Sequence, residues 1–225
     1  MSFLTRHAMP VMLFALVECA GAEVTTLDTM FPGRGWFDNS GQHMALNDNT
    51  STGSAGELSF RSFYVWDTSG LVGATILSAE LQLGSDAFFG NLVPIAFSIF
   101  DVSTSRTALV ADYAPGDATG LAIFSDLGSG NLYGGFSVTE VAPTVWVALL
   151  NDAALADLVA AVPSGEFAIG LSRTGGAEGI VRFEQTPRIQ RLVVTTTSAI
   201  PEPGTFLMLG LGLVAVACAR LRRPR

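Results

Sequence analysis

Few side chains in this sequence could perform acid–base or nucleophilic chemistry. Between the two terminal segments, residues 23–200 contain one histidine, His43, and no cysteine. A serine nucleophile would need His43 as its base, and no Gly-x-Ser-x-Gly stretch presents such a serine. One histidine without cysteine also excludes the common zinc sites. Because His43 lies in a polar stretch, we expect it at the surface or in a loop, and we expect the chain not to be an enzyme.

Carboxylates are plentiful, but their number does not identify a site. Residues 23–200 hold 18 acidic and 7 basic residues, a net charge of −11. Some pair among so many acids will meet, by chance alone, the separation of roughly 5 to 9.5 Å that glycosidases use. A polysaccharide hydrolase or lyase is therefore the least supported function. The negative charge also excludes nucleic-acid binding, which needs a cationic surface to displace counterions from phosphate.

Calcium needs only oxygen ligands, and several loops are rich in them. The densest cluster is residues 47–50, Asn-Asp-Asn-Thr, and Asp112 and Asp117 flank a Pro-Gly turn. No stretch has the EF-hand spacing, and Asp or Asn side chains in turns usually bond their own backbone. We predict no cofactor and leave a structural calcium ion open as an alternative, without naming its ligands.

The three tryptophans could stack on sugar rings or fill a core. Trp66 and Trp146 lie in apolar stretches that look like strands, so we expect both in the core. Trp36 stands between Gly35 and Phe37 in what looks like a loop, which makes it the candidate for contact with a glycan.

Short apolar stretches separated by turns rich in Gly, Asp and Asn must position these residues. They predict strands at residues 24–28, 43–46, 57–66, 75–83, 95–102, 121–124, 136–139, 144–149, 166–172, 179–185 and 188–197. Residues 151–161 instead predict a helix, because Asn151 or Asp152 can cap it and apolar residues recur at helical spacing. Many strands with one short helix favour a mainly β fold, an antiparallel β-sandwich of jelly-roll type.

The N-terminus has the features of a secretory signal peptide, which we assign to residues 1–22. Arg6 and His7 precede a short apolar core at residues 11–17, and Ala20-Gly21-Ala22 fits the small-x-small rule for cleavage. The two cysteines, Cys19 and Cys218, both lie in terminal segments, so we expect a mature fold without a disulfide.

The C-terminus combines a rigid tripeptide, an apolar run and a basic tail. Pro201-Glu202-Pro203 keeps Glu202 out of any helix and leaves its backbone extended. As a helix, residues 204–221 would be about 27 Å long at ~1.5 Å per residue, just enough to span a hydrocarbon core of ~30 Å. The basic residues that follow predict that this end faces the cytoplasm and the body faces out: Arg220, Arg222, Arg223 and Arg225.

This order of features resembles the PEP-CTERM sorting signal of bacterial exported proteins, over residues 201–225. The resemblance implies that an exosortase, a membrane-embedded cysteine-dependent enzyme, recognises Pro201-Glu202-Pro203 and removes the tail. It also implies transient anchoring in the cytoplasmic membrane, followed by delivery to the cell surface or extracellular matrix. The alternative is an ordinary single-pass C-terminal anchor whose prolines only end the helix.

Together these features predict three parts: a signal peptide (1–22), an extracellular β-sandwich (23–197) and a sorting signal (198–225). We interpret the chain as an exported surface or exopolysaccharide-matrix protein with a non-enzymatic structural or adhesive role. The alternative is a carbohydrate-binding module for secreted polysaccharide, which the acidic sandwich and Trp36 favour.

Overall fold

The computed structural model describes residues 21–29, 32–47, 49–85, 87–90, 94–140, 144–183 and 189–197. The chain divides into two compact units, Ala22–Ser198 and a second unit made of Met1–Gly21 with Ala199–Arg225. The expected signal peptide and the expected transmembrane helix at residues 204–221 lie outside the described residues. Within the described ranges, no helix combines the length and the apolar character needed to cross a membrane.

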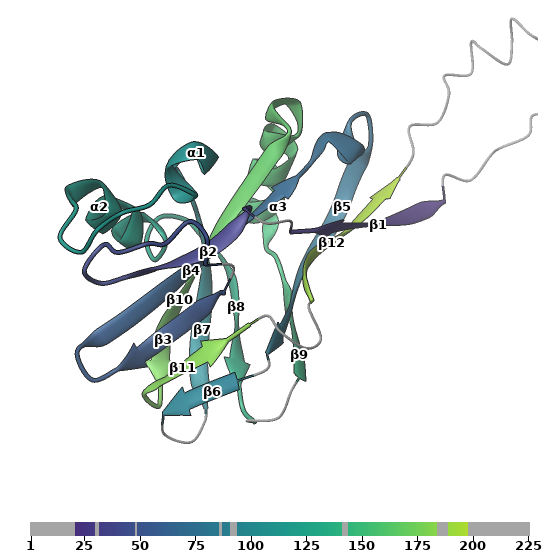
Figure 1. The fold of residues 1–225 in the computed structure, drawn as a ribbon. Coiled ribbons are helices and arrows are strands. Elements are labelled where there is room, and N and C mark those ends of the chain that lie inside the picture. The colour runs from purple at the N-terminus through teal and green to yellow at the C-terminus, as the bar shows by residue number, and fades with distance from the viewer. Residues whose placement is uncertain are drawn as a thin grey trace, which may run out of the picture. The chain divides into compact units, whose positions relative to one another are not determined.

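Two antiparallel sheets form the body, and they curl toward each other as a half-barrel (Figure 1). The four-stranded sheet has the order β1 (Ala22–Asp28), β12 (Gln190–Thr197), β5 (Thr75–Ser85) and β9 (Thr144–Leu149). The larger sheet has the order β6 (Ala87–Gly90), β11 (Gly179–Arg182), β3 (Ser51–Ala55), β4 (Leu58–Asp67), β10 (Glu166–Gly176), β7 (Ile95–Asp101) and β8 (Leu132–Val138), with β2 (Arg34–Asp38) paired to β4. This confirms the predicted mainly β, antiparallel fold.

The main core lies between the two sheets and follows from the alternation of the strands. In β12, buried and half-buried residues alternate from Gln190 to Thr197, and Leu192 and Val194 belong to this core. Tyr64 and Trp66 of β4 reach the same core from the larger sheet. Trp66 is 1% exposed, which confirms its predicted place, and Trp146 is half-buried against this core.

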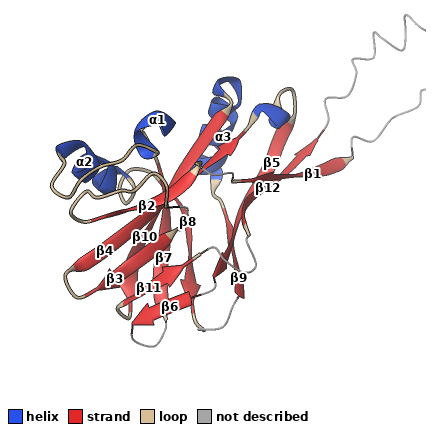
Figure 2. Ribbon diagram, viewed as in Figure 1, coloured by secondary structure: helices blue, strands red, loops and turns tan. Residues whose placement is uncertain are grey.

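β4 is buried on both faces, which explains its run of aromatic and branched residues. Phe63 and Val65 point away from the main core into a second cluster with Leu109, Ile123 and Leu127. Two helices supply that cluster and lie outside the larger sheet (Figure 2), α1 (Arg106–Leu109) and α2 (Ala118–Asp126). A strand between two apolar layers loses its polar alternation, because neither face meets water.

The strand predicted at residues 121–124 is wrong, because these residues form the second half of α2. Asp117 caps the helix by accepting from the amides of Thr119 and Gly120 at 2.8 and 3.1 Å. At the other end, the Arg61 guanidinium of β4 lies 4.3 Å from the Phe124 ring centroid and donates to the Phe124 carbonyl at 2.7 Å. The local N-cap and the tertiary contact with Arg61 both favour the helix over a strand.

The predicted helix at residues 151–161 is confirmed as α3 (Asp152–Ala161), with Asn151 as its N-cap. Two short 3₁₀ turns flank the neighbouring strands, at Ser69–Leu71 and Val162–Ser164.

Other sequence predictions also need correction. β2, β3 and β6 form at residues for which no strand was predicted. The strand expected at residues 43–46 is reduced to a single bridge between His43 and Tyr113. Thr, Ser and Gly dominate β3, so it carries no apolar signal and forms because β4 and β11 pair with it.

Candidate functional site

Trp36 lies on β2 and not in a loop, which corrects its expected setting. It stands opposite Ser62 in the pairing of β2 with β4, so it shares a face of the sheet with Ser62 and Phe60. Its ring meets that of Phe60 edge-to-face, with centroids 5.2 Å apart, and both side chains are half-buried. We call these two residues the Trp36–Phe60 pair. A half-exposed aromatic pair on a rigid strand can stack on an apolar sugar face.

Phe60 was not named as a candidate, because the sequence predicted only that it lies on the strand at residues 57–66. It lies near the strand's beginning, where Leu58 is 55% exposed, so the core no longer covers it. The signal in the sequence was its position three residues after Glu57, which lies in the turn before β4.

His43 lies outside the named strands and helices, as expected of a loop residue, but it is buried, which corrects the expectation of a surface position. It is 3% exposed and stacks on Phe37 with ring centroids 4.6 Å apart. Its Nδ1 lies 2.7 Å from the Trp36 carbonyl oxygen, and because a carbonyl can only accept, Nδ1 carries the proton. Burial lowers the pKa of His43, against the opposing effects of this hydrogen bond and of Asp112. His43 therefore holds β2 in place as a neutral imidazole.

The oxygen-rich loops considered for calcium use their oxygens within the fold. The Asn47 side chain accepts from the Asn49 amide at 3.1 Å, and Asp112 accepts from the Ala45 amide at 2.7 Å. Asp117 caps α2. Among the residues that the structure describes, no three His, Cys, Asp or Glu side chains gather as a metal site would require. Asp48 lies outside the described residues.

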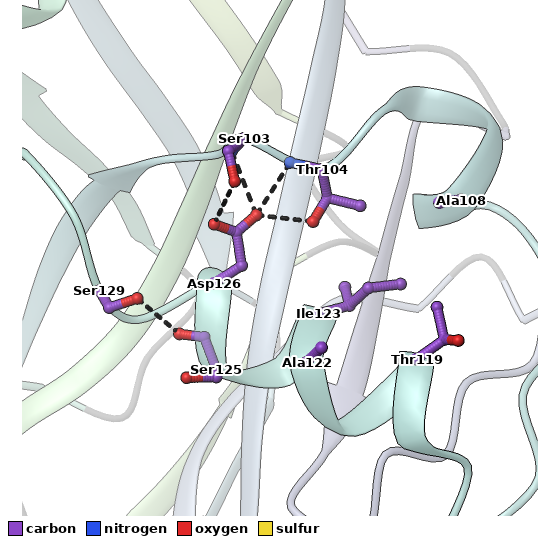
Figure 3. A pocket seen from close by; sticks show the side chains of 9 residues that line it. All are labelled: Ser103, Thr104, Ala108, Thr119, Ala122, Ile123, Ser125, Asp126 and Ser129. Atoms are coloured by element: carbon purple, nitrogen blue, oxygen red, sulfur yellow. Dashed lines mark hydrogen bonds between the residues drawn. The ribbon is translucent and has the colours of Figure 1, made fainter.

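A shallow depression of about 430 Å³ lies between the segment around α1 and the helix α2 (Figure 3). Asp126 is its charged residue, and its carboxylate accepts from the amides and hydroxyls of Ser103 and Thr104 at 2.6 to 3.1 Å. These four bonds tie the loop before α1 to the end of α2. The lining is otherwise small and mostly neutral: Ser103, Thr104, Ala108, Thr119, Ala122, Ile123, Ser125 and Ser129. Such a lining offers hydroxyl groups for contact but no nucleophile with a base.

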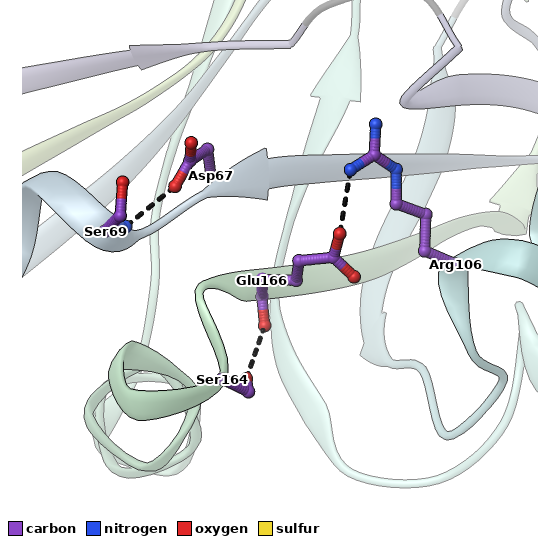
Figure 4. A network of polar contacts seen from close by, with 5 residues as sticks. All are labelled: Asp67, Ser69, Arg106, Ser164 and Glu166. Atoms are coloured by element: carbon purple, nitrogen blue, oxygen red, sulfur yellow. Dashed lines mark hydrogen bonds and ion pairs between the residues drawn. The ribbon is translucent and has the colours of Figure 1, made fainter.

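Two carboxylates stand opposite each other where β4 ends and β10 begins, at Asp67 and Glu166 (Figure 4). Arg106 of α1 forms an ion pair with Glu166 at 2.7 Å, and the Asp67 side chain accepts from the Ser69 amide at 2.8 Å. The Ser69 hydrogen bonds lower the pKa of Asp67. The Asp67 carboxylate thus favours the charged form, which suits a surface network and not a general acid.

The predicted sorting residues Pro201, Glu202 and Pro203, and the basic tail of Arg220, Arg222, Arg223 and Arg225, lie outside the described residues. The fold therefore neither groups them with the Trp36–Phe60 pair nor separates them from it.

A search of the whole chain against curated proteins finds no match. Residues 199–223 match the family model of the PEP-CTERM protein-sorting motif. This segment begins two residues after the end of β12 and contains the Pro-Glu-Pro tripeptide and most of the basic tail. The motif supports an exported protein that is sorted by exosortase through membrane association. The chain is thus identified, by its C-terminal segment, as a protein that carries a PEP-CTERM protein-sorting motif.

Proposed function

We propose that the β body is a non-enzymatic structural or adhesive component of the cell surface or of an exopolysaccharide matrix. The single observation that carries this proposal is the PEP-CTERM motif at residues 199–223, which directly follows a folded antiparallel β body. The sorting motif accounts for export, and the β body is the part of the protein that is exported.

The chemistry of the described residues favours a role without catalysis. His43 is buried and bonded to the backbone of β2, so it is not presented to a substrate. Asp38, Asp117 and Asp126 each accept two or more hydrogen bonds from nearby backbone or hydroxyl groups. Carboxylates held in this way stabilise loops and helix ends.

The processing part of the proposal is tested with Glu202→Ala in the full chain, expressed in a host that has an exosortase. We expect the wild-type protein released at the surface to end near residue 200 by intact mass, and the variant to keep its tail. Glu57→Ala, an exposed turn position, is the control and should be processed like the wild type. Full-length tail in all mature wild-type protein would overturn exosortase processing.

The role of the body is tested separately, with the processed protein and the exopolysaccharide of the same cells. We expect the protein to fractionate with the surface or matrix and to release no reducing ends on incubation. New reducing ends would make the body a hydrolase, and a freely soluble protein absent from both fractions would remove the structural or adhesive role.

The Trp36–Phe60 pair favours a second candidate, a carbohydrate-binding module. The two rings lie 5.2 Å apart on neighbouring strands and remain half-exposed, as a sugar-stacking platform requires. We expect Trp36→Ala to abolish binding on a glycan array. Phe89→Ala, which removes a 55% exposed aromatic ring on β6, should bind like the wild type. Binding that survives Trp36→Ala would exclude this platform.

A further inference from the structure

A largely buried carboxylate stands beside the Trp36–Phe60 pair. Asp38 is the last residue of β2 and is only 7% exposed. It lies directly opposite Phe60 in the pairing of β2 with β4, and it shares a face of β2 with Trp36, two residues earlier. The carboxylate and the two rings therefore belong to one patch, which we call the aromatic corner (Trp36, Phe60 and Asp38).

The hydrogen bonds of Asp38 leave one carboxylate oxygen unused. Oδ1 accepts from the amide and the hydroxyl of Ser40 at 2.9 and 2.6 Å, and from the Gln42 amide at 3.0 Å. Among the residues that the structure describes, none donates to Oδ2 and no cationic side chain pairs with Asp38. Oδ2 is nevertheless not fully enclosed. Because a carboxylate largely removed from water without a cationic partner is costly, a cation that reached Oδ2 would be stabilised there.

The two rings stand nearly perpendicular, so they form two walls beside this carboxylate. Their planes are inclined at 80°, with the centroids 5.2 Å apart. A cation is attracted to the face of a tryptophan within about 6 Å of the ring centroid, and aromatic walls of this kind hold ammonium groups in proteins. The indole of Trp36 and the carboxylate of Asp38 thus offer the two contacts that an organic ammonium group makes, a cation–π contact and a charge-assisted hydrogen bond.

The charges of the body favour an organic cation over an anion or a metal ion. Residues 23–200 carry a net charge of −11, which attracts cationic ligands and repels acidic polysaccharides. Arg34, two residues before Trp36 on β2, already has an interaction partner. Within the described ranges, Asp38 belongs to no group of three side chains that could hold a metal ion.

We infer that the aromatic corner binds an amino sugar that carries a free ammonium group, the repeating unit of a deacetylated glucosamine polymer. The apolar face of the sugar packs on Trp36, and its ammonium group donates to Oδ2 of Asp38. Positions 36 and 38 are about 7 Å apart along the strand at ~3.4 Å per residue, which one sugar ring and its amine span. This inference rests on the second candidate function, carbohydrate binding, and specifies its ligand as a cationic glycan.

Two ligands that differ only in their charge test the inference, with the full chain in mild detergent. The probes are the tetramers of glucosamine and of N-acetylglucosamine, each titrated by calorimetry. We expect the glucosamine tetramer to bind at least ~10-fold more tightly, the effect of one hydrogen bond to a charged group, and the difference to shrink as salt is added.

The other outcomes of this titration separate the inference from the function on which it rests. Equal affinity for the two tetramers would overturn the cationic ligand and leave carbohydrate binding through Trp36 intact. Tighter binding of a galacturonic acid tetramer would overturn the inference in favour of an acidic glycan. Binding to none of the three would also overturn it, and the glycan array would then decide the second candidate function by itself.

Asp38→Asn tests where the ammonium group binds. The amide oxygen of asparagine still accepts from the Ser40 and Gln42 amides, so the turn after β2 is kept while the negative charge is lost. We expect ~10-fold weaker binding of the glucosamine tetramer and unchanged binding of the acetylated one. Asp152→Asn removes the same charge from an exposed position on α3 and should bind like the wild type. Equal losses in the two variants, or no loss in Asp38→Asn, would contradict the assigned site.

Discussion

Ala22 and Thr197 stand directly opposite each other in the antiparallel pairing of β1 with β12. The first and last strands of the described body are therefore neighbours, and β12 lies inside the sheet between β1 and β5. The segment that carries the sorting motif thus continues from an interior strand held by hydrogen bonds on both sides. The hydrogen bonds of β12 with β1 and β5 must therefore stay intact for the body to remain folded as far as Thr197, the last residue of β12.

Trp66 is the largest fully buried side chain, and its removal tests the main core. We expect Trp66→Ala to lower the free energy of unfolding by about 3 to 5 kcal/mol, the cost of a large cavity. Its Nε1 is buried without a hydrogen-bond partner among the described residues, so Trp66→Phe should cost clearly less. Chemical denaturation measures both, and Leu149→Ala, at a 66% exposed position, serves as the control. Equal losses for Trp66→Ala and Leu149→Ala would contradict this core.

His43 should make stability depend on pH in the weakly acidic range. Burial lowers its pKa below the ordinary value of 6.5, so the unfolded chain binds a proton at a higher pH than the folded one. Stability is therefore full above pH 6.5 and falls as the pH drops toward the folded pKa, by at most about 1.4 kcal/mol per pH unit.

The measurement is urea denaturation at several pH values between 7.5 and 5.5, for wild type and His43→Gln. Both proteins share all carboxylates, so the difference between their pH slopes reports His43 alone. We expect the wild type to lose more stability than the variant across this range. Parallel slopes would show that His43 titrates as an exposed histidine does.

A substitution at Gly120 tests how closely α2 packs against the loop that follows β2. A Cβ at Gly120 would collide with the carbonyl oxygen of Gly41, which has a φ of +81°. Alanine has a higher helix propensity than glycine by about 1 kcal/mol. We nevertheless expect Gly120→Ala to lower the free energy of unfolding by about 1 to 3 kcal/mol, because the steric overlap costs more than the gain in helix propensity. Thr119→Ala, in the same turn but at an exposed position, should not destabilise. A thermal melt that rises for Gly120→Ala would contradict the close approach.

Asp117 should stabilise the same helix as its N-cap. Its carboxylate accepts from two amides of the first turn, so Asp117→Ala leaves both without a partner and should cost about 1 kcal/mol. Asp117→Asn, which keeps the acceptor, should recover most of this loss. Chemical denaturation compares the two, and an Asp117→Asn loss as large as that of alanine would assign the effect to charge and not to the cap.

The sequence by itself determined the elements whose local pattern agrees with their final setting. Residues 144–149 were predicted as a strand and form β9, and the Asn151 cap with helical spacing predicted α3. The PEP-CTERM motif was also readable, because a rigid tripeptide, an apolar run and a basic tail act through their order in the chain. In these cases the physical cause is contained within a few neighbouring residues.

Only the tertiary structure decided the others. Residues 121–124 are a short apolar run, which fits a strand and a buried helix equally well. The contacts of Gly120 with Gly41 and of Arg61 with Phe124, both between distant segments, favour the helix. β3 exists because its neighbours supply hydrogen-bond partners. His43 is buried because the rings of Phe37 on β2 and Phe63 on β4 pack against it. Burial depends on which distant segments pack against each other, and the pattern of a short stretch of sequence does not contain that information.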